Sequence, residues 1–315
     1  MAGAGRSRAV DGLKLVLALM VVGIHANPFA GFGHTAILLT GEGLYRLAVP
    51  VFLVFNGWYL QPAIAAGKGW ATVRRAAGLY ALWMILYLPL WIGFARNFQP
   101  WQALRFAVFG YWHLWYLAGL AMAAAALVGL ARWPTRPLLA LALALAAAGA
   151  AVSWAMGEGV LTPGPVFHDP LSAFRNPLFL CLPYAAFGLL MRREDLPGRI
   201  GRGAALALAA VGVGLVLAES LLRAALPVGV SHDAMASLVL AAPALALVAL
   251  QTPGVTASRA LGDHASGIYF LHVAFVALLI RHTDLARPMV YVLAVTGSLA
   301  LTEALRRAGL ARRLF

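Results

Sequence analysis

The sequence predicts an all-α, polytopic integral membrane protein with about ten transmembrane helices and both termini in the cytoplasm. Hydrophobic residues make up 62% of the 315 residues, charged residues make up 11%, and the mean hydropathy is +0.83. Soluble domains are usually about 45–50% apolar and about 25% charged. The apolar excess extends along the whole chain, so we expect a single transmembrane domain over residues 1–315.

Ten apolar segments are long enough, or nearly so, to cross a bilayer. A transmembrane helix needs roughly 20 mainly apolar residues, and Pro, Gly and charged residues mark the breaks between the segments. The sixth, eighth and ninth segments are short. The predicted spans are 13–30, 44–61, 76–95, 113–131, 137–156, 177–191, 203–222, 235–250, 266–281 and 288–305.

The basic residues sort onto one side of these spans. With a cytoplasmic N-terminus, most of the 24 Lys and Arg residues fall in cytoplasmic segments, as the positive-inside rule predicts. This topology accounts for the formal charge of +13 without a nucleic-acid partner. We therefore expect the chain among the lipids of a bacterial-type inner (cytoplasmic) membrane. The basic residues on the outer side are Arg46, Arg96, Arg105, Arg175, Arg223, Arg281 and Arg287.

Cysteine and histidine usage argues against disulfides and metal sites. The single cysteine, Cys181, excludes an internal disulfide bond and a cysteine-rich metal site. The eight histidines form no H-x-x-x-H or H-E-x-x-H pair, so we expect no metal.

The first predicted span contains two titratable residues, Lys14 and His25. Ionisable side chains at membrane depth are costly and usually face a bundle interior or a wet cavity. Eleven residues advance about 1100° on an α-helix, or three turns plus about 20°, so both lie on one stripe about 16 Å apart. A ligand spanning half of the bilayer could contact both. Alternatively, Lys14 is a surface anchor, and His25 bonds to a neighbouring helix.

Five short motifs follow one another along the chain. They are K-LVLALMVVGI-H (14–25), YRLAVPVFLVFNGWYL (45–60), VRRAAGLYALW (73–83), HLWYLAGL (113–120) and SGIYFLH (266–272). In this order they resemble the acyltransferase-3 family, integral-membrane enzymes that transfer acyl groups, often acetyl, from acyl-CoA to sugars and other acceptors. The resemblance extends over almost the whole chain.

Three positions depart from the family pattern. Most members have Arg where this chain has Lys14, and lysine lacks the bidentate fork of arginine. Asn56 replaces a serine of the second motif. Aligned on Tyr80, Arg75 matches the first Arg of the third motif, whereas Gly78 replaces the second. Arg74 could substitute, but neighbouring residues point about 100° apart on a helix.

The resemblance implies a role for each candidate residue. Lys14, Arg75 and Arg74 would hold the phosphates of acyl-CoA, and His25 would act as general base on a hydroxyl of a cell-envelope glycan or small acceptor. The alternatives are helix packing and an interfacial aromatic belt. Glu42 and Asp169 are expected to be solvated loop acids or to orient His25. The expected substrate-binding residues are Asn56, His113, Trp115, Tyr116, Tyr269 and His272.

Two other function classes remain open. Ten spans with intramembrane Lys and His would also suit a transporter or flippase of a glycan or small molecule. A non-catalytic membrane subunit, altered at Gly78, is the second possibility. Thermal stabilisation by CoA and turnover of acetyl-CoA separate these classes.

Overall fold

The computed structural model describes residues 6–162, 170–256 and 258–315. This part of the chain is mostly helical, and its described strands have two residues each, which confirms the all-α prediction. Its long helices are α1 (Arg8–Ala26), α3 (Ala48–Ala65), α4 (Gly69–Leu86), α7 (Trp115–Gly129), α8 (Thr135–Gly157), α11 (Arg202–Arg223), α13 (Ala260–His282) and α14 (Arg287–Arg307). The shorter elements are β1 (Arg6–Ser7), α2 (His34–Leu39), α5 (Leu88–Ala95), α6 (Pro100–Phe109), α9 (Leu182–Arg193), α10 (Leu196–Arg199), α12 (Leu238–Gln251), β2 (Val255–Thr256) and α15 (Ala311–Leu314).

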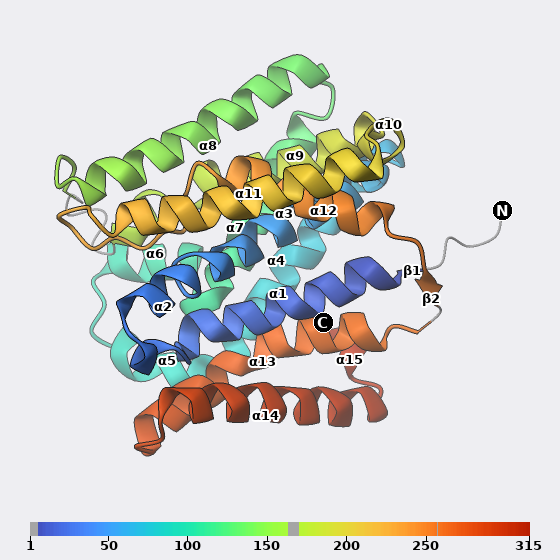
Figure 1. Cartoon of the computed structure of the whole chain (residues 1–315). Helices are drawn as coiled ribbons and strands as arrows, with labels where there is room; N and C mark the ends of the chain where they lie inside the picture. The colour runs from blue at the N-terminus through green and yellow to red at the C-terminus, as the bar shows by residue number, and fades with distance from the viewer. Residues whose placement is uncertain (1–5, 163–169, 257) are drawn as a thin grey trace.

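The long helices run roughly side by side, with α8 and α14 at opposite edges of the bundle (Figure 1). The main packed pairs are α3 with α9, α11 with α12, α1 with α13, α13 with α14 and α4 with α7. The start of α1 and the antiparallel β1–β2 pair lie at one end of the bundle, which we call the N-terminal end. At the opposite end lie α2, α5 and α6, and we call it the α6 end.

Each of the ten predicted spans overlaps a helix, and the protein has membrane-embedded helices. Among the described residues, seven helical segments are long and apolar enough to cross a bilayer. The exact number of crossings and the cytoplasmic position of the termini stay predictions. The seven segments are Arg8–Ala26, His34–Ala65, Trp112–Gly129, Thr135–Gly157, Arg202–Arg223, Ala260–His282 and Arg287–Arg307.

The predicted span 76–95 is interrupted in the structure. Two helices cover it, α4 and α5, and the break falls at Tyr87. Pro89 accounts for the break, because proline has no N–H to donate to the carbonyl of Ile85, and its ring clashes with that carbonyl in a continuous helix.

Two glycines bring α3 and α9 into backbone contact. A Cβ on Gly57 would collide with the carbonyl oxygen of Ala185, and a Cβ on Gly188 would collide with that of Val54. Small residues at such a contact let membrane helices approach closely. The contact anchors α3, the helix that carries Asn56, at the centre of the bundle.

Candidate functional site

His25 lies in the last turn of α1, the helix that also carries Lys14. The side chain of Ser7 accepts a hydrogen bond from the backbone N–H of Val10 and caps the start of the helix. Asn27 ends it in the left-handed conformation. The helix is uninterrupted between Lys14 and His25, so the two residues share one helical stripe, as the spacing predicts.

Lys14 packs against α3. Its ammonium nitrogen lies 5.5 Å from the ring centroid of Phe55 and 5.0 Å from that of Tyr59. Cation–π contacts of this kind hold a lysine over an aromatic face. Lys14 is half-buried, so it makes specific contacts with a neighbouring helix in addition to any anchoring role.

Three histidine rings meet near the α6 end of α1. The ring of His272, on α13, lies 5.2 Å from the ring of His25 and 5.0 Å from that of His113, measured between centroids. His113 belongs to a single 3₁₀ turn directly before α7. His113 and His272 are 3% and 0% exposed, whereas His25 is partly exposed. The structure thus brings together three residues that are far apart in the sequence.

The backbone of α13 determines the tautomer of the neutral His272 ring. Nδ1 lies 2.9 Å from the carbonyl oxygen of Ile268 and 2.8 Å from that of Tyr269. Because both partners only accept hydrogen bonds, Nδ1 carries the proton and Nε2 carries the lone pair. Nε2 is buried and receives no hydrogen bond from any described residue. The ring can therefore accept a hydrogen bond within the cluster.

Two tyrosines and an asparagine form a buried layer beside the histidines. The hydroxyl of Tyr269 donates to the backbone oxygen of His113 at 2.8 Å, and its ring lies 5.5 Å from that of Tyr116. The amide nitrogen of Asn56 donates to the Tyr116 hydroxyl at 2.6 Å and to the carbonyl of Phe52 at 2.8 Å. Both amide protons are thus used in bonds that link α3 to α7. This is the helix-bridging role, and substrate contact by Asn56 stays a prediction.

A cavity of about 510 Å³ opens beside His25 at the α6 end. This volume falls within the range of about 300–1,000 Å³ that is typical of small-molecule sites. His25 faces this cavity on one side and the buried His272 ring on the other. The described lining residues are Ile24, His25, Phe98, Trp101, Gln102, Arg105, Phe106, Phe109, Gly110, Trp112, Trp115, Ser172 and Arg175.

Of the predicted substrate-binding residues, Trp115 is the one in this lining. The guanidinium of Arg175 lies 5.2 Å from its ring centroid. Trp112, which the sequence reasoning did not select, also lines the cavity, with its ring 5.3 Å from that of His25. The remaining predicted residues form the buried layer behind His25 rather than the cavity wall.

Arg75 reaches the far end of the chain. Its Nη2 donates to the carbonyl oxygen of Phe315 at 3.0 Å, and the Phe315 ring stacks with those of Trp83 and Phe270 at 6.3 and 6.0 Å. Arg74 is exposed and makes no hydrogen bond to any described residue. Arg75 is therefore the arginine of this pair that contacts the bundle.

A buried ion network lies next to the cavity, and no motif in the sequence indicated it. Arg46 is 8% exposed and donates to the carboxylates of Asp233 at 2.8 Å and Glu42 at 2.7 Å. Arg175, from the cavity wall, reaches the Asp233 carboxylate at 3.9 Å. Burial by itself raises the pKa of Asp233, but Arg46 and Arg175 outweigh it and hold that pKa below its usual value.

Of the two acids expected to be solvated or to orient His25, the structure describes Glu42 but not Asp169. Glu42 pairs with Arg46 and accepts a hydrogen bond from the backbone N–H of His232, so it is neither a solvated loop charge nor a hydrogen-bond partner of His25. Asp169 lies outside the described residues.

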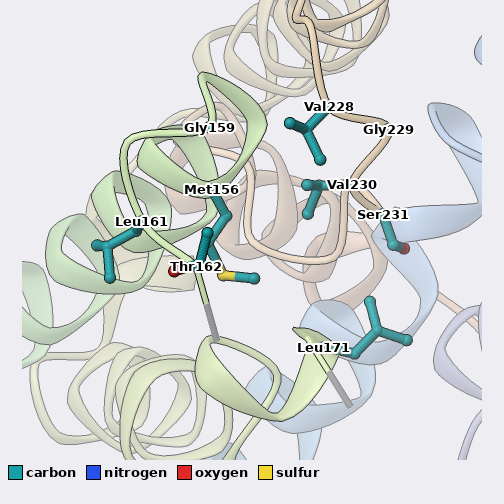
Figure 2. A pocket seen from close by; sticks show the side chains of 9 residues that line it. All are labelled: Met156, Gly159, Leu161, Thr162, Leu171, Val228, Gly229, Val230 and Ser231. Atoms are coloured by element: carbon teal, nitrogen blue, oxygen red, sulfur yellow. The ribbon is translucent and has the colours of Figure 1, made fainter. Parts of the chain in front are cut away.

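A second, smaller cavity of about 250 Å³ lies beyond the end of α8 (Figure 2). Met156, Val228 and Val230 turn apolar side chains toward it, and Thr162 and Ser231 contribute hydroxyls. Its described lining contains no titratable side chain, so it lacks an acid–base group. We therefore place the candidate site at the larger cavity beside His25. Among the described residues, no three His, Cys, Asp or Glu side chains are arranged to hold a metal ion.

Comparison with known proteins places the chain in a family. The acyltransferase-3 family model, described as an acyltransferase domain, matches residues 7–307. The chain belongs to the acyltransferase-3 family. This confirms the resemblance noted from the motifs, and the matched range of the acyltransferase-3 domain contains Lys14, His25 and every other predicted site residue.

Curated relatives of this acyltransferase-3 chain carry racemase names. It is 23% identical to a serine/alanine racemase from Enterococcus gallinarum over 253 residues, which is 73% of this chain and 35% of that protein. An amino-acid racemase from Enterococcus faecalis is 27% identical over 124 residues, or 37% of this chain and 17% of that protein. The chain thus spans about a third or less of the length of these relatives. No solved structure is significantly similar to it.

Proposed function

We propose that this acyltransferase-3 protein transfers an acyl group, most simply acetyl, from acyl-CoA to a hydroxyl of a cell-envelope glycan or related acceptor. The observation that most directly supports this proposal is the position of His25, between an open cavity and the buried His113–His272 cluster. Membership of the family supports membrane acyl transfer. Amino-acid racemisation is not carried over, because the relatives with that name match over a minor part of their length.

The proposed reaction needs one base and no other co-reactant. A neutral His25 nitrogen removes the proton of the acceptor hydroxyl, and the oxygen bonds to the thioester carbonyl carbon. The carbon–sulfur bond then breaks, and the CoA thiolate takes the proton from the imidazolium. The products are an ester and free CoA. Imidazole suits this task because its ordinary pKa lies close to the working pH.

The donor is assigned to the side of the bundle that carries Lys14. Its phosphates would bind Lys14 and Arg75, with Arg74 as a weaker neighbour. The rise of α1 places Lys14 about 16 Å from His25, a separation that the long pantetheine arm can bridge. Arg75 would have to exchange its hydrogen bond with Phe315 for one with the donor.

The direct test is turnover of labelled acetyl-CoA by the purified chain in lipid nanodiscs. We expect His25→Ala to abolish transfer while the protein still inserts and purifies. His34→Ala is the matched control, because His34 is exposed on α2, and it should keep full activity. Full turnover by His25→Ala would remove the catalytic assignment. A separate experiment identifies the acceptor: glycans and lipids of a deletion strain are analysed for the loss of acetyl mass.

The same preparation separates the alternative classes. An enzyme that binds the donor is thermally stabilised by CoA through ligand linkage, whereas a transporter of another solute is not. Stabilisation by CoA without turnover would indicate a non-catalytic subunit. The proposed location is the bacterial inner membrane with both termini in the cytoplasm, which reporter fusions to each terminus would check.

A further inference from the structure

The cavity beside His25 has two arginines in its described lining. Arg105 comes from α6, Arg175 follows the 3₁₀ turn Pro170–Ala173, and no Asp or Glu occurs among the described lining residues. Two other basic residues assigned to the same side form close pairs with acids: Arg46 with Asp233, and Arg223 with Glu219. Among the described residues, the two arginines are thus the fixed charges of the cavity wall.

Arg105 is the arginine of this wall whose charge is least compensated by acids among the described residues. Its Nη1 atom is buried, and no described residue hydrogen-bonds to it. A buried guanidinium nitrogen without a partner is costly, because it has lost its water and gained nothing in exchange. An anionic group in the cavity would supply the missing acceptor.

Arg175 contributes a second guanidinium. It lies over Trp115 at 5.2 Å, and its ion pair with Asp233 is long at 3.9 Å. Asp233 makes shorter bonds with Arg46 at 2.8 Å and with the Ser231 hydroxyl at 2.7 Å. The Asp233 carboxylate is thus shared among three partners, and the described lining residues of the cavity include two arginines and no acid.

The rest of the lining suits a hydroxylated molecule. Trp101, Trp112 and Trp115 offer flat aromatic faces, and Gln102 and Ser172 add groups that can hydrogen-bond with hydroxyls. Aromatic walls with a few polar groups are the usual make-up of a small-molecule site.

We infer that this cavity binds an acceptor that carries an anionic group, a carboxylate or a phosphate, next to the hydroxyl that is acylated. Arg105 and Arg175 hold the anion through charge-assisted hydrogen bonds, and the hydroxyl lies at His25. The inference deepens the proposed function and rests on it for the role of acceptor, whereas anion binding by the cavity can be measured without turnover.

The test uses three sugar probes that differ in charge. Methyl glucoside is neutral, methyl glucuronide carries a carboxylate, and glucose 6-phosphate carries a phosphate. Thermal shifts of the full-length protein in nanodiscs, at constant ionic strength, report binding through linkage. We expect at least one anionic probe to bind about tenfold or more tightly than methyl glucoside, and the better anion identifies the group. Equal shifts from charged and neutral probes, or none from either anion, overturn the inference.

Variants of Arg105 assign the effect to the cavity. Arg105→Gln should weaken binding of the anionic probe about tenfold or more, and Arg105→Lys should lose less because it keeps the charge. Arg96→Gln is the control, since Arg96 is exposed and lies outside the lining, and it removes the same charge without changing probe binding. Anion binding that is unchanged in Arg105→Gln contradicts the inference.

CoA itself separates the acceptor from the donor, which also carries phosphates. We expect stabilisation by CoA to be the same in wild type and Arg105→Gln. Loss of CoA stabilisation in Arg105→Gln would assign the cavity to the donor phosphates instead. Anion binding that depends on Arg105, without turnover of acetyl-CoA, would contradict the proposed function but not this inference. Turnover of acetyl-CoA without a preference for anionic probes would contradict this inference but not the proposed function.

Discussion

The ring of His25, in the last turn of α1, lies 5.2 Å from the ring of His272, in the middle of α13. The two helices pack against each other, so a whole helix interface maintains this distance. The carbonyls of Ile268 and Tyr269 in turn hold the His272 ring. We therefore predict that His272 is a positioning residue for His25.

Replacement of His272 by Ala should therefore reduce kcat for acetyl transfer by about a hundredfold, because a displaced base loses its alignment with the substrate. KM for acetyl-CoA should change little, since the donor phosphates are assigned to the other end of α1. The pH profile of kcat should also shift, because His25 loses a titratable neighbour. The exposed His282, at the end of α13, is the control, and His282→Ala should resemble wild type. An unchanged pH profile in His272→Ala would reduce His272 to a packing residue.

Gly188→Ala should destabilise the bundle by about 1–3 kcal/mol, the usual cost of overpacking. The added Cβ collides with the carbonyl of Val54 on α3, where backbone cannot yield as a flexible side chain can. Gly214→Ala is the matched control, because this glycine is exposed within α11 and has no atom near its Cβ position. It should be neutral or stabilise by about 0.5–1 kcal/mol. Thermal unfolding in one detergent checks both variants, and equal stabilities would contradict the close α3–α9 contact.

Asp233→Asn should cost stability at neutral pH, because it removes a charged partner of the buried Arg46. Breaking a buried ion pair costs about 3–5 kcal/mol. Because Arg46 keeps its second partner, Glu42, we expect a loss near the lower end of this range. The folded pKa of Asp233 lies below its unfolded value of about 3.9. The stabilisation is thus complete above about pH 5 and is lost as the pH falls through the folded pKa.

Thermal unfolding between pH 3 and pH 8 would show this dependence. The difference in stability between wild type and Asp233→Asn should be constant above about pH 5 and should become smaller below about pH 4. His232 is present in both proteins, so its protonation cancels to first order. Asp284→Asn, at an exposed position, should show no gap at any pH. A gap that widens toward low pH would exclude a stabilising Asp233 carboxylate.

Gly78→Arg should lower KM for acetyl-CoA, since it restores the second basic residue of the third motif. The position accepts a side chain, because Gly78 is exposed and has no atom near its Cβ position. An exposed ion pair contributes about 0.2–1 kcal/mol, so we expect a KM up to about fivefold lower. Gly78→Gln controls for the removal of a helical glycine. If both variants change KM equally, charge at this position is irrelevant to the donor.

Local sequence features predicted the helices well and their ends less well. Each apolar stretch marked a helix because its hydrophobicity is a property of consecutive residues. The break at Tyr87 depended on one proline, Pro89, inside an otherwise apolar run. The amphipathic helix α6, which carries Arg105, was missed because ten residues with an arginine are too short and too polar to read as a span.

The pairing of Lys14 with His25 was predictable because both lie on one helix with a known rise and turn. The pairing of Arg46 with Asp233 was not, since the two residues are separated by most of the chain and no motif links them.

The amino-acid sequence by itself determined that this protein is a helical membrane protein of the acyltransferase-3 type and that His25 lies about three turns after Lys14. Hydrophobicity, charge and helical spacing are local, so they can be read along the chain. Only the tertiary structure decided that His272 lies beside His25, that His113 lies beside His272, and that Arg105 shares the cavity of His25. These neighbours lie on α13, on the 3₁₀ turn before α7 and on α6, and the packing of the whole bundle determines where they meet.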